Sequence, residues 1–210
     1  MENSKSIYTA LVALFIGAAL LGSSAIFVRF SETSPSLTAF YRALLALPFL
    51  YIWVLRTKSD LPLRAYLSKE NILIFSLAGV FFGTDMAIWN WAISFTSVAH
   101  ATLMANTAPI FVTLISFFFL REKIKSSFFR ALLLSFTGVG MVILSGSGSD
   151  SFRLLGDALG LAAAIFYAAY ILVIKRITNT LPPAHTLFFA TLFTAIFLFT
   201  VGLIESDTFF

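Results

Sequence analysis

The sequence contains no cysteine, and charged residues make up only 11% of its 210 residues. The lack of cysteine excludes disulfide bonds, thiolate metal sites and cysteine nucleophiles. Soluble domains are about a quarter charged, so this composition excludes an ordinary water-soluble enzyme, a disordered chain and a nucleic-acid-binding protein. The two histidines cannot form a plausible zinc site without cysteine, and no glycine-rich phosphate loop is present. We therefore expect no metal, no cofactor and no ATP-driven pump in this chain alone.

Apolar residues make up 59% of the chain, and its mean hydropathy is +0.94. A helix needs about 20 apolar residues to cross a bilayer, and continuous apolar runs satisfy their backbone groups in lipid only as helices. The sequence therefore predicts an all-α membrane protein with about seven transmembrane helices. The predicted spans are residues 8–29, 36–55, 72–94, 98–120, 127–145, 154–174 and 184–204.

Basic residues predict the orientation of these spans. Eleven of the 14 basic residues fall on the side that holds the N-terminus and the second, fourth and sixth loops. They are Lys5, Arg56, Lys58, Arg64, Lys69, Arg121, Lys123, Lys125, Arg130, Lys175 and Arg176. Because basic loops stay in the cytoplasm, we expect a multi-pass protein of the cell membrane with a cytoplasmic N-terminus.

A short internal repeat joins the second and seventh predicted spans. They begin Pro35-Ser-Leu-Thr38-Ala-Phe40-Tyr41 and Pro183-Ala-His-Thr186-Leu-Phe188-Phe189, which share the pattern Pro-x-x-Thr-x-Phe-aromatic. The period is five helices, so the second copy enters from the opposite face, as in the inverted repeats of many transporters. We expect a five-helix repeat over 1–147 and the first two helices of a second repeat over 154–210. On this interpretation the chain is truncated or incompletely recorded; the alternative is a seven-span protein without a repeat.

Several motifs resemble the EamA-type proteins of the drug/metabolite transporter superfamily. They are Tyr41-Arg42, the stretch AISFTSVAHATLMANTAP over 92–109, Leu120-Arg-Glu122-Lys123, Gly138-Val-Gly140-Met-Val-Ile-Leu and Gly156-Asp157-Ala-Leu-Gly160. The resemblance covers nearly the whole chain. It implies ten helices in two inverted halves and the export of small metabolites. This chain departs from that pattern because it lacks helices eight to ten.

Two ionisable side chains lie deep within predicted spans. By helix rise, Arg42 lies about 9 Å below the outer edge, and Asp85 lies about 20 Å from the inner edge. Charges at such depth are costly and by default mark a functional site or a pair. We expect Arg42 and Asp85 to face the bundle interior and to interact. They form either a site for substrate or protons, or a static pair that fixes two helices.

The other candidate pathway residues are polar or aromatic. Asn90 and Asn106 fall in the same outer layer, where they either line a cavity or join helices by hydrogen bonds. Trp89 lies one turn from Asp85 and either stacks on a substrate or anchors the helix at the interface. Thr102, Asn106 and Pro109 share one helix face with Thr113. Pro109 bends its span as a pathway hinge or as a packed kink.

The sequence thus predicts a transporter that exports small metabolites or drug-like solutes by alternating access. Its expected partners are the bilayer and an unidentified small molecule, with no nucleic acid and an open oligomeric state. The alternative is a truncated, non-transporting membrane protein or helical scaffold. A hydrolase is not expected: His100 and Asp85 could join a serine triad on paper, but nothing builds a nucleophile turn or an oxyanion hole.

Overall fold

The structure is a computed structural model, and it describes residues 2–59, 61–118, 121, 126–145, 151–178 and 180–206. Three residues of the motif near 120, Leu120, Glu122 and Lys123, lie outside the described residues. The described residues form helices and turns with no strand, so the predicted all-α fold is confirmed. They fall into two units, residues 1–32 and 33–210.

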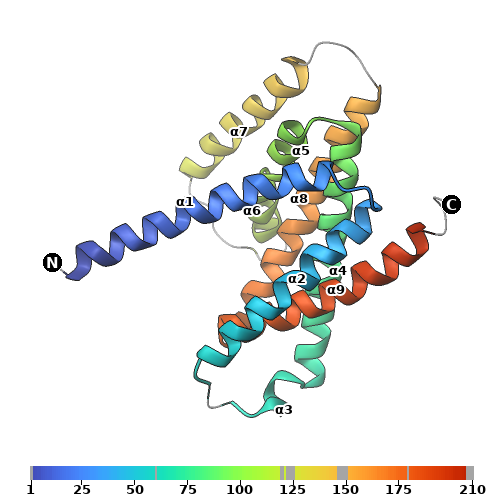
Figure 1. Cartoon of the computed structure of the whole chain (residues 1–210). Helices are drawn as coiled ribbons and strands as arrows, with labels where there is room; N and C mark the ends of the chain where they lie inside the picture. Colours follow the sequence, from blue (N-terminus) through green and yellow to red (C-terminus); the bar gives the residue numbers. More distant parts are fainter. Residues whose placement is uncertain are drawn as a thin grey trace. The chain divides into compact units, whose positions relative to one another are not determined.

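Nine helices occur in the described part of the chain (Figure 1). The first unit contains α1 (Glu2–Arg29). The second unit contains α2 (Pro35–Arg56), α3 (Leu63–Tyr66), α4 (Lys69–Phe95), α5 (Val98–Ala105), α6 (Ala108–Phe118), α7 (Ser126–Ser145), α8 (Ser151–Thr178) and α9 (Pro183–Ser206). The described residues of the seven predicted spans are helical, except for a turn at Asn106 and Thr107 in the fourth. The short helix α3 is new, because the sequence indicated only a polar loop there.

Five of these helical segments are long and apolar enough to cross a membrane. They are α2, α4, the α5–α6 segment, most of α8 and α9. The first and fifth predicted spans form α1 and α7, which are not among these five within the described residues. The chain is thus a multi-pass membrane protein.

The fourth predicted span is broken rather than bent. Helix α5 ends at Ala105, a turn follows at Asn106 and Thr107, and Pro109 is the second residue of α6. Proline has no N–H, and its ring clashes with the carbonyl four residues earlier, which here belongs to Ala105. In the first turn of a helix neither defect matters. The chain therefore ends one helix before the proline and starts another around it.

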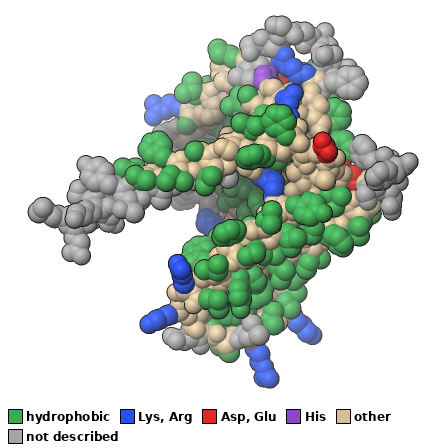
Figure 2. All heavy atoms as spheres, in the orientation of Figure 1, with side chains coloured by type: hydrophobic (Ala, Val, Ile, Leu, Met, Phe, Trp, Pro, Cys, Tyr) green, Lys and Arg blue, Asp and Glu red, His purple; other side chains and the backbone are tan. Residues whose placement is uncertain are grey.

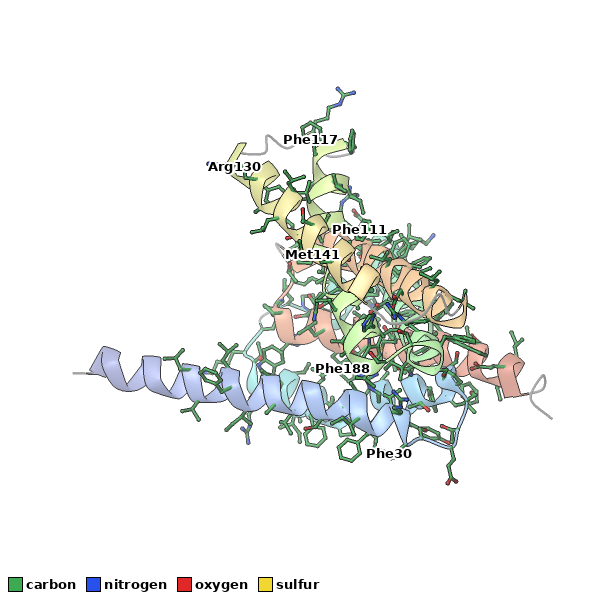
Figure 3. All side chains as sticks on the ribbon, turned by 90° about the horizontal axis from the view of Figure 1, so that it is seen from above. Phe30, Phe111, Phe117, Arg130, Met141 and Phe188 are labelled. Atoms are coloured by element: carbon green, nitrogen blue, oxygen red, sulfur yellow. The ribbon has the colours of Figure 1, made fainter. Side chains whose placement is uncertain are left out.

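Helix α4 is the centre of the second unit. It packs against α2, α5, α8 and α9, while α2 also packs along α9 and α8 along α5 and α6. One apolar cluster joins α2, α4 and α9 through Ala39, Ala43, Met86, Ala87, Ala195 and Leu198. A second cluster, at the end that holds α3, contains Tyr66, Phe75, Ile177 and Leu181. Figure 3 shows Phe117 of α6 and Arg130 of α7 toward the same end of the unit.

Glycines allow very close contacts between helices. A Cβ atom on Gly79 of α4 would lie 2.7 Å from backbone and side-chain atoms of Phe193 in α9. A Cβ on Gly160 of α8 would lie 2.7 Å from Cβ of Met104 in α5. Real Cβ atoms do not approach so closely, so both positions require glycine for this packing.

Lys and Arg side chains project at the end of the molecule where α3 lies (Figure 2). The orientation remains a prediction, which single cysteines in this cysteine-free chain can test. Both Lys58, before α3, and Ala99, in the first turn of α5, are exposed. We expect Ala99→Cys to react with an impermeant thiol reagent in intact cells, and Lys58→Cys only after permeabilisation. The unmodified chain is the blank, and labelling of Lys58→Cys in intact cells would reverse the orientation.

Candidate functional site

Arg42, in the second turn of α2, is held by two residues of α4. Its Cζ lies 5.4 Å from the centroid of the Trp89 ring, which is the geometry of a cation–π contact. Its Nη1 donates a hydrogen bond of 3.4 Å to Oδ1 of Asn90. The guanidinium therefore lies between α2 and α4, and Trp89 contacts a cation of the chain itself.

Asn90 joins α4 to the start of α2. Its side chain is buried, and its Nδ2 donates a 2.7 Å hydrogen bond to the carbonyl of Pro35. Pro35 is the first residue of α2, so this bond fixes α4 at the very start of that helix. With Arg42 on its Oδ1, the Asn90 amide uses both its donor and its acceptor to join the two helices.

Replacing Asn90 with leucine is expected to lower the free energy of unfolding by about 1–3 kcal/mol. The change keeps the volume but leaves the Pro35 carbonyl and the Arg42 guanidinium without their partner. Asn106→Leu is the matched control, because Asn106 is exposed and its change should stay within about 0.5 kcal/mol. Unfolding of the purified variants in dodecyl sulfate measures both values. Equal losses in the two variants would contradict the bridging role of Asn90.

Asp85 lies one helical turn before Trp89 on α4 and is 9% exposed. It interacts electrostatically with Arg42, but the two described side chains form no direct salt bridge. Aromatic side chains surround this stretch: the Phe82 ring stacks on Tyr170 at 4.6 Å, and Tyr167 interacts electrostatically with Asp85. Two ionisable side chains, Arg42 and Asp85, therefore lie near each other without direct contact, beside aromatic residues of α8.

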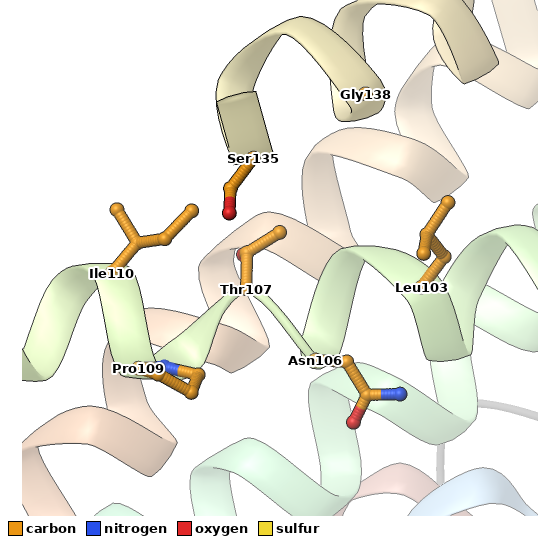
Figure 4. A pocket seen from close by; sticks show the side chains of 7 residues that line it. All are labelled: Leu103, Asn106, Thr107, Pro109, Ile110, Ser135 and Gly138. Carbon is orange, nitrogen blue, oxygen red and sulfur yellow. The ribbon is translucent and has the colours of Figure 1, made fainter. Parts of the chain in front are cut away.

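A separate pocket of about 420 Å³ lies where α5 gives way to α6 (Figure 4). Its lining comes from both sides of the helix break and from α7: Leu103, Asn106, Thr107, Pro109, Ile110, Ser135 and Gly138. In Figure 4 the Ser135 side chain points from α7 toward Thr107. Thr107 itself is tied down, since its hydroxyl donates a 2.6 Å hydrogen bond to the Met104 carbonyl.

The structure divides the predicted site residues into two groups. Arg42, Asp85, Trp89 and Asn90 gather between α2 and α4, whereas Asn106 and Pro109 line the pocket at the helix break. Thr102 belongs to neither group, and its buried hydroxyl has no hydrogen-bond partner among the described residues. The break interrupts the face that Thr102 and Thr113 were expected to share with Asn106.

Sequence reasoning missed the partners that other helices bring to these sites. Tyr167 and Tyr170 of α8 had a weak signal, two tyrosines one turn apart in an apolar span. Ser135 and Thr107 had none, because isolated hydroxyl residues are common in membrane helices. Within the described residues no group of three His, Asp or Glu side chains could hold a metal ion. The described side chains of these sites offer a cation, aromatic faces and hydrogen-bonding groups.

The sequence of this chain is similar to those of several known proteins. The family model of the EamA-like transporter family matches residues 8–144. The "Uncharacterized transporter YetK" of Bacillus subtilis (strain 168) is 27% identical over 205 residues, 95% of this chain and 62% of the relative. The "Uncharacterized transporter YxxF" of the same organism is 28% identical, with 90% and 60% covered.

A third relative matches a shorter part of the chain. The "Riboflavin transporter" of Vibrio cholerae is 30% identical over 93 residues, which is 44% of this chain and 30% of that protein. The chain thus spans less than two thirds of the length of each of these relatives. The family model nevertheless covers well over half of the chain, in agreement with its apolar helices. The chain belongs to the EamA-like transporter family.

Proposed function

We propose that this chain forms a multi-pass transporter that exports small metabolites or drug-like solutes from the cell by alternating access. The observation that carries the proposal is the pair of ionisable side chains, Arg42 and Asp85, that lie near each other inside the helix bundle. Ionisable groups within membrane helices are expensive and mark substrate or ion pathways by default. The relatives named as transporters support the same activity.

Alternating access needs two parts that move against each other, and the repeat supplies a basis for them. Helices α2 and α9 begin alike at Pro35 and Pro183, and they pack along each other. They run in opposite directions, since Glu205 near the end of α9 accepts a 3.0 Å hydrogen bond from the backbone N–H of Ser36. This arrangement is what inverted repeats over 1–147 and 154–210 would produce.

The proposed site would recognise a solute through charge and aromatic surface. Arg42 and Asp85 offer opposite charges, and Phe82, Tyr167 and Tyr170 offer ring faces beside them. The pocket at the α5–α6 break would form a second part of the pathway, because broken helices line the binding sites of many transporters. Riboflavin, a planar aromatic solute, is a reasonable first probe given the name of the Vibrio cholerae relative.

Transport by purified protein tests the proposal. The gene is expressed with any continuation of its reading frame, and the protein is reconstituted in vesicles with riboflavin or ethidium as the probe. We expect saturable flux of at least one probe, and Asp85→Asn should reduce it about tenfold or more, a loss of about 1.4 kcal/mol or more. Glu70→Gln is the matched control, because Glu70 is an exposed carboxylate on the same helix.

Two outcomes would contradict the proposal. Full flux in well-folded Asp85→Asn would remove Asp85 from the site. Folded protein that moves neither probe would favour the alternative, a helical membrane scaffold without transport. The abundance of each variant in the membrane, measured beside its flux, separates a lost site from a lost fold.

A further inference from the structure

A second buried carboxylate, Asp157 in the second turn of α8, lies where three helices meet. The residue is 2% exposed. The Thr96 hydroxyl, at the end of α4, donates a 3.1 Å hydrogen bond to its Oδ1. Nδ1 of His100 in α5 lies 3.4 Å from the same oxygen, and Nε of Arg153, one turn earlier in α8, lies 3.9 Å from Oδ2. This cluster is distinct from the Arg42–Asp85 site.

The hydrogen bonding of the cluster is incomplete. A carboxylate accepts several hydrogen bonds, but Thr96 supplies a single short one, and Arg153 is too distant for another. Neither Nδ1 of His100 nor Oδ2 of Asp157 has a hydrogen-bond partner in the described part of the chain. If Nδ1 carries no proton, its lone pair faces the carboxylate. A proton at this nitrogen would convert that contact into a charge-assisted hydrogen bond.

The imidazole of His100 is partly exposed, although its Nδ1 atom is buried. The side chain of His100 is 22% exposed, while that of Asp157 is 3% exposed. Across the described residues, the charged or titratable groups that face Asp157 are His100 from α5 and Arg153 from its own helix. Thr96 from α4 is uncharged, and α6 has no titratable side chain. Histidine is the side chain that changes charge between pH 5 and 8.

The cluster lies at the first turn of α5. The backbone N–H of His100 is fixed by Ser97, and one turn later Met104 packs directly on Gly160 of α8. Helix α5 then ends at the Asn106–Thr107 turn, which borders the 420 Å³ pocket. A charge-assisted hydrogen bond between His100 and Asp157 would therefore join the first half of the broken span to α8. Its loss would free α5 and the pocket wall to move.

We propose that His100 and Asp157 form a proton-binding site that fastens α5 to α8, and that loss of the proton loosens α5. Acid strengthens the contact between His100 and Asp157 because a proton on His100 produces a cation beside a buried carboxylate. This contact affects the position of a helix, so the proposal does not depend on the proposed transport activity. The contact would make the opening of the broken span sensitive to the pH at that membrane face.

A buried cysteine on α5 reports the opening. Met104 is fully buried under α8 and Ala99 is exposed, so Met104→Cys and Ala99→Cys are made separately in the cysteine-free chain. The purified proteins in detergent react with a maleimide at pH 5.5 and pH 8. Each rate is divided by the rate of the same variant unfolded in dodecyl sulfate at that pH, which removes the intrinsic pH dependence of the thiol.

We expect the corrected rate of Met104→Cys to be about tenfold higher at pH 8 than at pH 5.5, a difference of about 1.4 kcal/mol. Ala99→Cys should show no change. Adding His100→Gln should bring the pH 5.5 rate to the pH 8 level, and Asp157→Asn should raise the rate at both pH values. His185→Gln, which removes the other histidine, is the matched control and should keep the full pH dependence.

Three results would overturn the proposal: a Met104→Cys rate that does not change with pH, a rate that rises in acid, or a pH dependence that survives His100→Gln. If Asp157→Asn fails to fold, the proposal is still tested by comparing the pH dependence of the Met104→Cys rate in His100→Gln and His185→Gln. Transport plays no part in this assay, so its result is independent of the vesicle experiment.

Discussion

Replacing Arg42 with glutamine is expected to cost about 2.5–3.5 kcal/mol of stability, the cost of leaving a charge alone within a membrane helix bundle. The change removes the charge that faces the Asp85 carboxyl, along with the cation–π contact to Trp89 and the hydrogen bond to Asn90. Asp85→Asn should cost less, because Arg42 then keeps both Trp89 and Asn90. The loss of stability should therefore be larger for Arg42→Gln than for Asp85→Asn.

The double variant, Arg42→Gln with Asp85→Asn, should recover part of the loss seen in Arg42→Gln alone, because no unpaired charge is left buried. Contacting residues typically couple by about 0.5–3 kcal/mol. Membrane abundance and unfolding in dodecyl sulfate measure all three variants against the unmodified chain. If the two single effects simply add, the residues do not interact in the folded protein. Normal abundance and flux in all three variants would make Asn106 and Trp89 the leading site residues.

Replacing Gly79 with valine is expected to destabilise the second unit by about 1–3 kcal/mol or to prevent its folding. The three atoms nearest to the new Cβ, all within 3 Å, are the backbone C and the Cβ of Phe193 and the backbone N of Thr194 in α9. Backbone cannot rotate out of the way as a side-chain tip can, so α4 and α9 must separate. This contact lies between two of the best-packed helices of the unit.

Gly140→Val is the matched control for this change. Gly140 lies in α7, where an added Cβ would meet no described atom within 4 Å, and the intrinsic effect on helix formation is the same. Unfolding in dodecyl sulfate should show a clear loss for Gly79→Val and little change for Gly140→Val. Similar stability of the two variants would mean that α4 and α9 do not pack as closely as the structure has them.

The helices were predictable because each depends on local sequence. Ser34 and Pro35 show the value of local signals, since the serine caps α2 and the proline occupies its first position. The prediction for Pro109 was partly confirmed. A bend in the fourth predicted span was expected there, but the helix breaks at Asn106 and Thr107 instead. The position depends on which carbonyl clashes with the ring and on the turn that replaces the lost helix.

The candidate site was less predictable, because its members come from helices far apart in the sequence. Arg42 and Asp85 lie close enough to interact electrostatically without a direct salt bridge, and their depth in the membrane stays a prediction. The role of Asn90 as a bridge to the Pro35 carbonyl could not be predicted, since it depends on how α4 lies against the start of α2. Asp157 carried the general signal of an ionisable group in a span, but its neighbour His100 lies 57 positions earlier on another helix.

Composition and periodicity by themselves determined that this chain is a helical membrane protein, because apolar runs of this length have no other way to satisfy their backbone in lipid. They also identified Arg42 as a residue whose burial is costly, whereas the cost at Asp157 emerged only from the structure. Only the tertiary structure decided what compensates each of them: Trp89 and Asn90 for Arg42, and Thr96 and His100 for Asp157. The physical reason is that the cost of burying a charge is local, whereas its compensation comes from whichever helix packs beside it.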